Sequence, residues 1–142
     1  MTKAYVNTDG SAVRPEPGPA GAGYVILYRG AEGWDTIVGA VPLRPVTHHE
    51  AEYEAAILAL TRAAQLGATS VVLGTDSRLL VDQMNKRASV VAPQLIRPHK
   101  RLNRRVERFD GTVTFVHVDR KHNKAADKLA GFARKESESK FG

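Results

Sequence analysis

The chain has 142 residues, of which 42% are hydrophobic and 25% are charged, and it contains no cysteine. These values predict one soluble globular domain and exclude disulfides, thiolate catalysis and thiolate metal sites. No apolar run approaches the roughly 18 residues that a membrane span needs, and the first residues lack a signal-peptide core, so we expect a cytoplasmic protein without a membrane partner.

The formal net charge of +6 favours a polyanionic partner, because lysine and arginine that neutralise phosphates release counterions and gain affinity. The charge is concentrated in segment 94–108, where Leu95, Leu102 and Val106 recur at helical spacing beneath a crowd of arginines. This pattern predicts an amphipathic helix with a basic outer face. An ordinary solvated helix face would give the same pattern.

The first third of the chain reads as strands separated by glycines. Gly30 and Gly33 leave a connection short enough only for a hairpin. Segment 14–21 is rich in proline and glycine and is expected to form a loop. The strands predicted here cover residues 4–9, 22–29 and 34–41.

The rest of the chain alternates helices and strands, which implies crossovers to parallel neighbours. We expect Gly67 to cap the long helix and Asn123 to cap the last one. The helices predicted are 50–66, 77–86, 94–108 and 123–135, and the strands are 70–75 and 112–118. An α/β fold follows, with a mixed five-stranded sheet flanked by helices, three strands antiparallel and two parallel.

Four acids stand where such a sheet could bring them together. Asp9 and Asp76 each end a β-prone run, in Thr-Asp-Gly-Ser and Thr-Asp-Ser, whereas Glu52 and Asp127 fall on predicted helices beside apolar faces. Converging carboxylates would form a divalent-metal site. Asp127 by itself is also explained as a favourable acid near a helix N-terminus.

The motifs Thr-Asp-Gly-Ser, His-His-Glu-Ala-Glu-Tyr-Glu, Thr-Asp-Ser and Asn-x-x-Ala-Asp-x-Leu-Ala follow one another in an order that resembles ribonuclease H type 1. The resemblance spans roughly residues 3–133 and is closest to short archaeal and actinobacterial forms, because segment 83–93 has no basic handle. It implies a ribonuclease H-like catalytic domain over 1–135. From its polar composition, we expect the tail at 136–142 to fray. The implied activity is metal-dependent endonucleolytic hydrolysis of the RNA strand of RNA/DNA hybrids, leaving 5′-phosphate and 3′-hydroxyl ends.

The resemblance also implies residue roles. It makes Asp9, Glu52, Asp76 and Asp127 the ligands of two Mg²⁺ ions, with Mn²⁺ as an alternative metal, and we expect Asp9 to bridge the two ions. Arg120 occupies the position of an arginine that precedes the fourth acid in short forms. We favour it over His122 as the group that assists the leaving phosphate, and expect His117 to be structural.

A further set of residues is expected to contact the substrate, an RNA/DNA hybrid, with double-stranded RNA as a second candidate. Two histidines stand where relatives often carry amides that read the minor groove, and the basic helix offers cations to the backbone. Helix-cap and turn roles would equally explain the hydroxyl residues. The set is Gly10, Ser11, Thr47, His48, His49, Ser77, Arg78, Arg101, Arg104 and Arg105.

Three alternatives stay open. The chain could be a catalytically inactive nucleic-acid-binding module of the same fold, or a nuclease of that fold acting on DNA. A zinc site built from His48, His49 and Glu52 lacks a second helical histidine at four-residue spacing. We expect a monomer.

Overall fold

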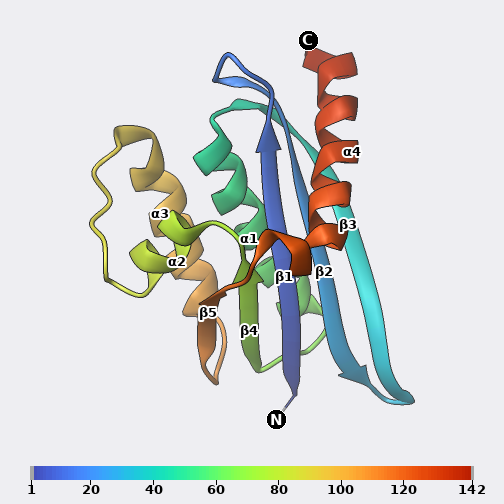
Figure 1. Cartoon of the computed structure of the whole chain (residues 1–142). Helices are drawn as coiled ribbons and strands as arrows, with labels where there is room; N and C mark the ends of the chain where they lie inside the picture. Colours follow the sequence, from blue (N-terminus) through green and yellow to red (C-terminus); the bar gives the residue numbers. More distant parts are fainter. Residues whose placement is uncertain (1, 142) are drawn as a thin grey trace.

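The computed structural model describes residues 2–141. Their central element is one five-stranded sheet (Figure 1). In chain order the strands are β1 (Lys3–Ala12), β2 (Gly18–Gly30), β3 (Gly33–Val46), β4 (Ser70–Thr75) and β5 (Val113–His117). The helices are α1 (His48–Gln65), α2 (Arg78–Met84), α3 (Pro93–Val106) and α4 (Lys124–Phe141), and the 3-10 turn η1 (Arg120–His122) precedes α4.

The sheet order is β3-β2-β1-β4-β5. β2 pairs antiparallel with both β1 and β3, whereas β4 pairs parallel with both β1 and β5. The predicted mixed sheet, with its antiparallel and parallel halves, is therefore confirmed. β1 lies at the centre and belongs to both halves.

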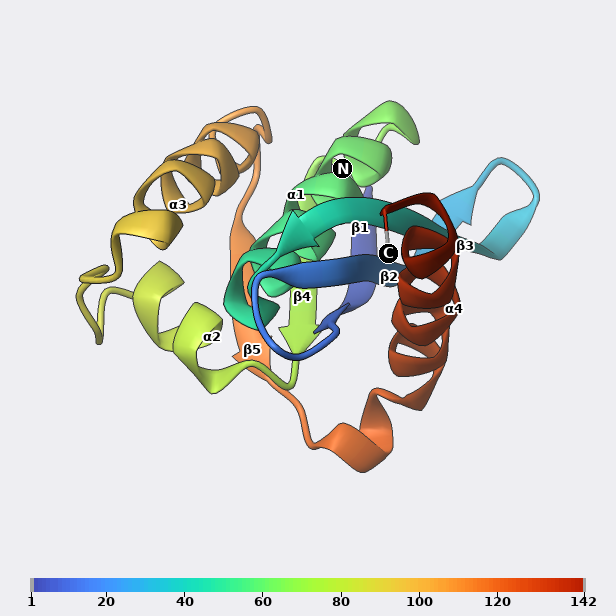
Figure 2. The same cartoon turned by 90° about the horizontal axis from the view of Figure 1, so that it is seen from above.

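Helices cover both faces of the sheet. α1 packs on one face and α4 on the other, as Figures 1 and 2 show, and α3 lies beside α1. The largest fully buried side chains include Tyr53 and Leu60 of α1, Ile26 of β2 and Leu73 of β4, so the core lies between α1 and the sheet. No helix within residues 2–141 is both long and apolar enough to cross a lipid bilayer.

α1 is capped at both ends, and the predicted cap at Gly67 is confirmed. Thr47 forms a capping box, because its hydroxyl accepts from the Glu50 amide and the Glu50 carboxylate accepts from the Thr47 amide. At the other end Gly67 adopts a φ of +88°, the left-handed conformation that favours glycine after a helix.

Two segments predicted to be irregular contain regular structure. β2 already begins at Gly18, inside the segment predicted as a loop, so only its first part stays irregular. The prediction of a frayed tail is wrong, because α4 continues to Phe141. Ser137 is buried, donates to the Leu43 carbonyl at 2.6 Å and accepts from the Ala20 amide at 3.1 Å. This docking onto β2 and β3 stabilises a segment whose polar composition alone suggested disorder.

Candidate functional site

Strand pairing places two of the four acids side by side. Thr8 of β1 pairs with Thr75 of β4 in the parallel register. Asp9 follows Thr8, and Asp76 follows Thr75 directly after β4 ends. Parallel neighbours in register present the residues after such a pair at the same level of the sheet, so the two carboxylates meet.

Glu52 approaches this pair from the second turn of α1. Carboxylate oxygens of Asp9, Glu52 and Asp76 all lie within 4.8 Å of one another. Asp9 and Glu52 are buried, with 4% and 2% of their surface exposed, and the Asp76 side chain is 16% exposed. The neighbouring acids Glu50 and Glu54 face other partners, since Glu50 belongs to the capping box and Glu54 pairs with Arg101.

Gly10 explains how α1 comes so close to β1. It is buried, and a Cβ at this position would overlap backbone atoms of Ala51 and Glu52. Any larger residue would push α1 away from the strand and move Glu52 off the cluster. Gly10, which we predicted to contact substrate, thus has a structural role in assembling the three acids.

The cluster concentrates negative charge in a dry place. Burial, followed by the Glu52 charge, a hydrogen bond with the Asp127 carboxyl and the Asp76 charge, raises the pKa of Asp9 to about 10. Burial also raises the pKa of Glu52, although its hydrogen bond with His48 opposes this effect. The protein alone therefore holds these carboxylates in unfavourable surroundings for their charged forms.

The residues fit a divalent cation. Three carboxylates converge, and Oε2 of Glu52 is buried without a hydrogen-bond partner among the described residues. An orphaned buried oxygen is costly, and a hard cation such as Mg²⁺ takes oxygen ligands. Positive charge at this point would relieve both the repulsion among the acids and the missing contact.

The fourth acid lies at the edge of this cluster. Asp127, in the first turn of α4, lies close enough to Asp9 to raise its pKa but is exposed and is not one of the three acids within 4.8 Å of each other. α4 is anchored nearby, because the buried Asn123 amide donates to the Thr8 carbonyl at 2.9 Å. Asn123 therefore ties the start of the helix to β1. Its predicted capping role is not confirmed, because its side-chain oxygen has no hydrogen-bond partner among the described residues.

A cleft of about 410 Å³ opens beside the acids. Arg120 lines it, with Nε 3.7 Å from Oδ2 of Asp76 and a side chain that is 82% exposed. His122 does not line this cleft and instead lies 4.0 Å from Asp119. The geometry therefore places Arg120, and not His122, next to the acidic cluster.

The two histidines at the start of α1 differ. Nε2 of His48 lies 3.3 Å from Oε1 of Glu52, and this contact raises the pKa of His48. The backbone amide of His48 donates to the Glu16 carboxylate, which reaches over from the proline-rich loop. His49 is exposed and lines the cleft. Since the described cluster contains no histidine, the zinc alternative has no support.

Other predicted substrate contacts are partly engaged within the protein. Thr47 caps α1, and Ser77 caps α2 by accepting from the Leu80 amide at 3.3 Å. Ser11 accepts from Arg134 of α4 at 3.0 Å. Of these three residues, Ser77 also lines the cleft.

The basic helix α3 divides its cations between two tasks. Arg101 pairs with Glu54, and Arg105 Nε donates to the Thr61 hydroxyl at 3.0 Å, so both hold α3 against α1. Arg104 is exposed, as are Arg97 and Lys100 of the same helix and Arg108 just after it. Sequence spacing showed an excess of cations, but only packing shows which ones are free.

His117 lies in the site, although the sequence interpretation gave it a structural role. His117 ends β5 opposite Thr75, lines the cleft, and has Nδ1 at 3.3 Å from Nη2 of Arg78. We expected it to be structural because it lies within a strand. Its position at the end of a strand next to β4 was the available signal, because neighbouring parallel strands end at the same edge of a sheet.

Comparisons with known proteins agree with this geometry. The family described as reverse transcriptase-like matches residues 7–133. A ribonuclease HI from Halobacterium salinarum is 36% identical over 135 residues, which are 92% of this chain and 64% of that protein. A bifunctional protein of Mycobacterium tuberculosis is 31% identical, and the match covers 35% of its length. The chain thus spans less than two thirds of these relatives.

Solved structures match over more of their length. The N-terminal ribonuclease H domain of a Mycobacterium tuberculosis protein superposes with a TM-score of 0.88 at 30% identity, covering 99% of both chains. The ribonuclease H1 of Halobacterium salinarum gives 0.82 at 31%, covering 94% of this chain and 98% of that one. LC11 ribonuclease H1, solved in complex with an RNA/DNA hybrid, gives the same score, identity and coverage.

Proposed function

Because the chain belongs to the reverse transcriptase-like family and is a member of ribonuclease H type 1 by sequence and fold, we propose that it hydrolyses the RNA strand of RNA/DNA hybrids. The observation that carries this proposal is the buried cluster of Asp9, Glu52 and Asp76 beside an open cleft. The relative solved with a hybrid supports the choice of substrate.

The acids are the residues that would hold divalent cations. We assign two Mg²⁺ ions, with Mn²⁺ as the alternative, to Asp9, Glu52 and Asp76, and Asp127 completes the set from its exposed position beside Asp9. When bound, such cations supply the Lewis acidity that makes water a nucleophile at neutral pH and stabilises the leaving oxygen. Cleavage would leave a 5′-phosphate and a 3′-hydroxyl.

The protein itself supplies positioning. His48 holds Oε1 of Glu52, and the capping box at Thr47 fixes the first turn of α1, so Glu52 has one orientation. Arg120 is a fixed cation near Asp76 that can bind an oxygen of the scissile phosphate. Arg78 and His49 line the same cleft and offer donors to the neighbouring backbone and sugar.

Strand-specific cleavage tests this proposal. An end-labelled RNA/DNA hybrid, a matched RNA duplex and a matched DNA duplex are incubated with the protein in Mg²⁺, in Mn²⁺ and in EDTA. We expect metal-dependent cutting of the RNA strand of the hybrid, and loss of that cutting in Asp9→Asn. Cutting of only the DNA duplex would contradict the proposal that the RNA/DNA hybrid is the substrate.

Tight hybrid binding with no cutting of any substrate would instead support the inactive binding module. Cutting of the RNA duplex would broaden the substrate range without changing the chemistry. The monomeric state and the cytoplasmic location stay predictions.

A further inference from the structure

One half of the α4 face of the sheet is uncovered. α4 is tied to β1 at Thr8 and lies over the half of the sheet that contains Gly23, where a Cβ would overlap the backbone of α4. Gly23 pairs with Asp9 in the antiparallel register, so Asp9 lies on this face. Alternate residues of a strand share a face, which puts Tyr5 and Lys3 on it too, beyond the start of α4.

The strand register assembles the uncovered half into rows. Tyr5 pairs with Leu27, and Leu27 pairs with Thr36. Arg29 pairs with Trp34, and continuing the β1–β2 register puts Lys3 opposite Arg29. We call this set the open sheet face, and it comprises Lys3, Tyr5, Leu27, Arg29, Trp34 and Val38.

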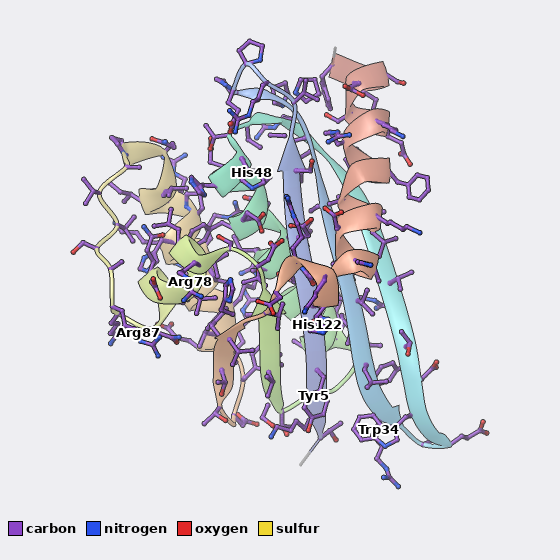
Figure 3. All side chains as sticks on the ribbon, viewed as in Figure 1. Tyr5, Trp34, His48, Arg78, Arg87 and His122 are labelled. Carbon is purple, nitrogen blue, oxygen red and sulfur yellow. The ribbon has the colours of Figure 1, made fainter. Side chains whose placement is uncertain are left out.

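The apolar members of the open sheet face are unusually exposed. The exposed fractions are 44% for Tyr5, 39% for Leu27, 53% for Trp34 and 57% for Val38. Single exposed apolar residues are ordinary, but a contiguous group on one sheet face marks an interaction site. Figure 3 shows Tyr5 and Trp34 together at the end of the sheet that lies away from His48.

The two aromatic rings form a pair with cations around them. The ring centroids of Tyr5 and Trp34 are 6.2 Å apart, with their planes tilted by 44°. Nζ of Lys3 lies 5.8 Å from the Tyr5 centroid. A pocket of about 480 Å³ is lined by both rings together with Lys3 and Arg29.

The charged side chains of the open sheet face are all positive. Lys3 and Arg29 are exposed, and within residues 2–141 neither forms a salt bridge. The nearest acid in β3, Asp35, lies next to Trp34 in sequence and so falls on the opposite face, where its carboxylate accepts from the Thr36 amide. A partner for this face therefore needs negative charge and flat apolar groups at once.

We propose that the open sheet face binds single-stranded nucleic acid, with bases stacking on Trp34 and Tyr5 and phosphates lying against Lys3 and Arg29. Unpaired bases offer both of their faces to aromatic side chains, whereas a duplex buries them. The core of a protein–protein interface is depleted of lysine, but here Lys3 contacts the aromatic pair. The proposal needs neither metal nor cleavage, so it stands or fails separately from the proposed function.

The position of this face gives it a use. Tyr5 lies four residues from Asp9 along β1, which is about 13 Å. An unpaired strand that continues from the cleft therefore reaches the aromatic pair over a short distance. The protein would then recognise junctions between a hybrid and a single strand better than the hybrid alone.

Trp34 is the only tryptophan of the chain, so its fluorescence reports on this site alone. The protein in EDTA is titrated with oligothymidylate of about ten nucleotides, a length within the range that single-strand sites cover. We expect saturable quenching of Trp34. By anisotropy of the labelled oligonucleotide, Trp34→Ala should weaken binding at least about fivefold, the lower end of the usual effect of one base–aromatic stack.

Arg29→Gln, which keeps both rings, should weaken binding and reduce its dependence on salt. Phe132→Ala removes an aromatic of α4 that is 63% exposed and serves as the matched control, with no expected loss. Thermal melting checks the fold of each variant, and Arg29→Gln keeps the test decisive if Trp34→Ala does not fold.

Two outcomes would overturn the proposal. One is unchanged Trp34 emission at saturating oligonucleotide, which means that the strand binds elsewhere. The other is concentration-dependent self-association in sedimentation that Trp34→Ala abolishes while oligonucleotide binding stays unchanged, which would make this face a contact between two copies of the chain.

Discussion

The two ends of β1 carry side chains of opposite character. At the Asp9 end, carboxylates are buried together and one oxygen of Glu52 has no partner in the described structure. At the Lys3 end, on the same face of the strand, two aromatic rings are exposed to water. The first end is short of positive charge, and the second is short of apolar cover. The Asp9 end therefore fits a bound cation, and the Lys3 end fits a partner that stacks on its rings.

The comparison also shows where the fold restrains its residues. The acids are held by helices on both sides, because Gly10 of β1 lies against α1 and Asn123, just before α4, binds Thr8 of β1. The rings at the other end are held only by the sheet itself. Substitutions at the Asp9 end should therefore affect catalysis and folding together. This combined effect distinguishes the Asp9 end from the Lys3 end in experiments.

The largest effect is expected for Glu52→Gln. Removing one charge from the buried cluster at nearly constant volume should lower hybrid cleavage by about 10³-fold or more, because several kcal/mol of transition-state stabilisation are lost. Glu54→Gln is the matched control, since Glu54 lies one half-turn along the same helix and pairs with Arg101. Rates are compared by single-turnover cleavage in Mg²⁺. Equal losses in both variants would show that α1 as a whole, and not the cluster, is sensitive.

The next effect concerns the close approach of α1. Gly10→Ala places a methyl group into the backbone of α1 and should lower the free energy of unfolding by about 3 kcal/mol. Gly131→Ala, a helical position with nothing within 4 Å, should instead stabilise by about 0.5–1 kcal/mol. Urea unfolding measures both. A Gly10→Ala variant as stable as the original chain would mean that α1 can shift without loss.

The third effect is a dependence of stability on pH in EDTA. The pKa of Asp9 is raised in the folded protein to about 10, from about 3.9 in the unfolded chain. Between these values the folded state binds the additional proton, so stability is complete below about pH 4 and is lost as the pH rises toward 10. Asp9→Asn removes this loss and should melt about 5 °C higher than the original chain at pH 8.

Thermal melting from pH 5 to pH 9 checks this slope. Added Mg²⁺ should raise the melting temperature of the original chain but not that of Asp9→Asn, because only the former keeps the full set of ligands. If the melting temperatures of the original chain and of Asp9→Asn changed in parallel with pH in EDTA, the raised pKa assigned to Asp9 would be contradicted.

The smallest effect is expected at the mouth of the cleft. Arg120→Ala should reduce kcat by about tenfold, as expected for one lost charged contact to phosphate, with the fold unchanged because the side chain is exposed. His122→Ala is the matched control from the same turn and should stay near the original rate. The opposite ranking in steady-state kinetics would assign the assisting role to His122.

Much of the fold followed from the sequence because its signals are local. Alternation of strands and helices predicted the mixed sheet, and Gly67 marked the end of α1. The failures have non-local causes. The polar tail after Lys135 forms the last turns of α4, since Ser137 finds its partners on β2 and β3, far away in sequence.

For the site, the order of motifs identified the acids and the family, because the strand ends and helix starts that carry them are set by short-range patterns. Only the tertiary structure brought three of these acids within 4.8 Å and left Asp127 at their edge. It also turned Arg101 and Arg105 inward, moved His117 into the cleft, and exposed Tyr5 beside Trp34. These outcomes depend on contacts between distant segments, and no local pattern encodes which face of an element its neighbours will cover.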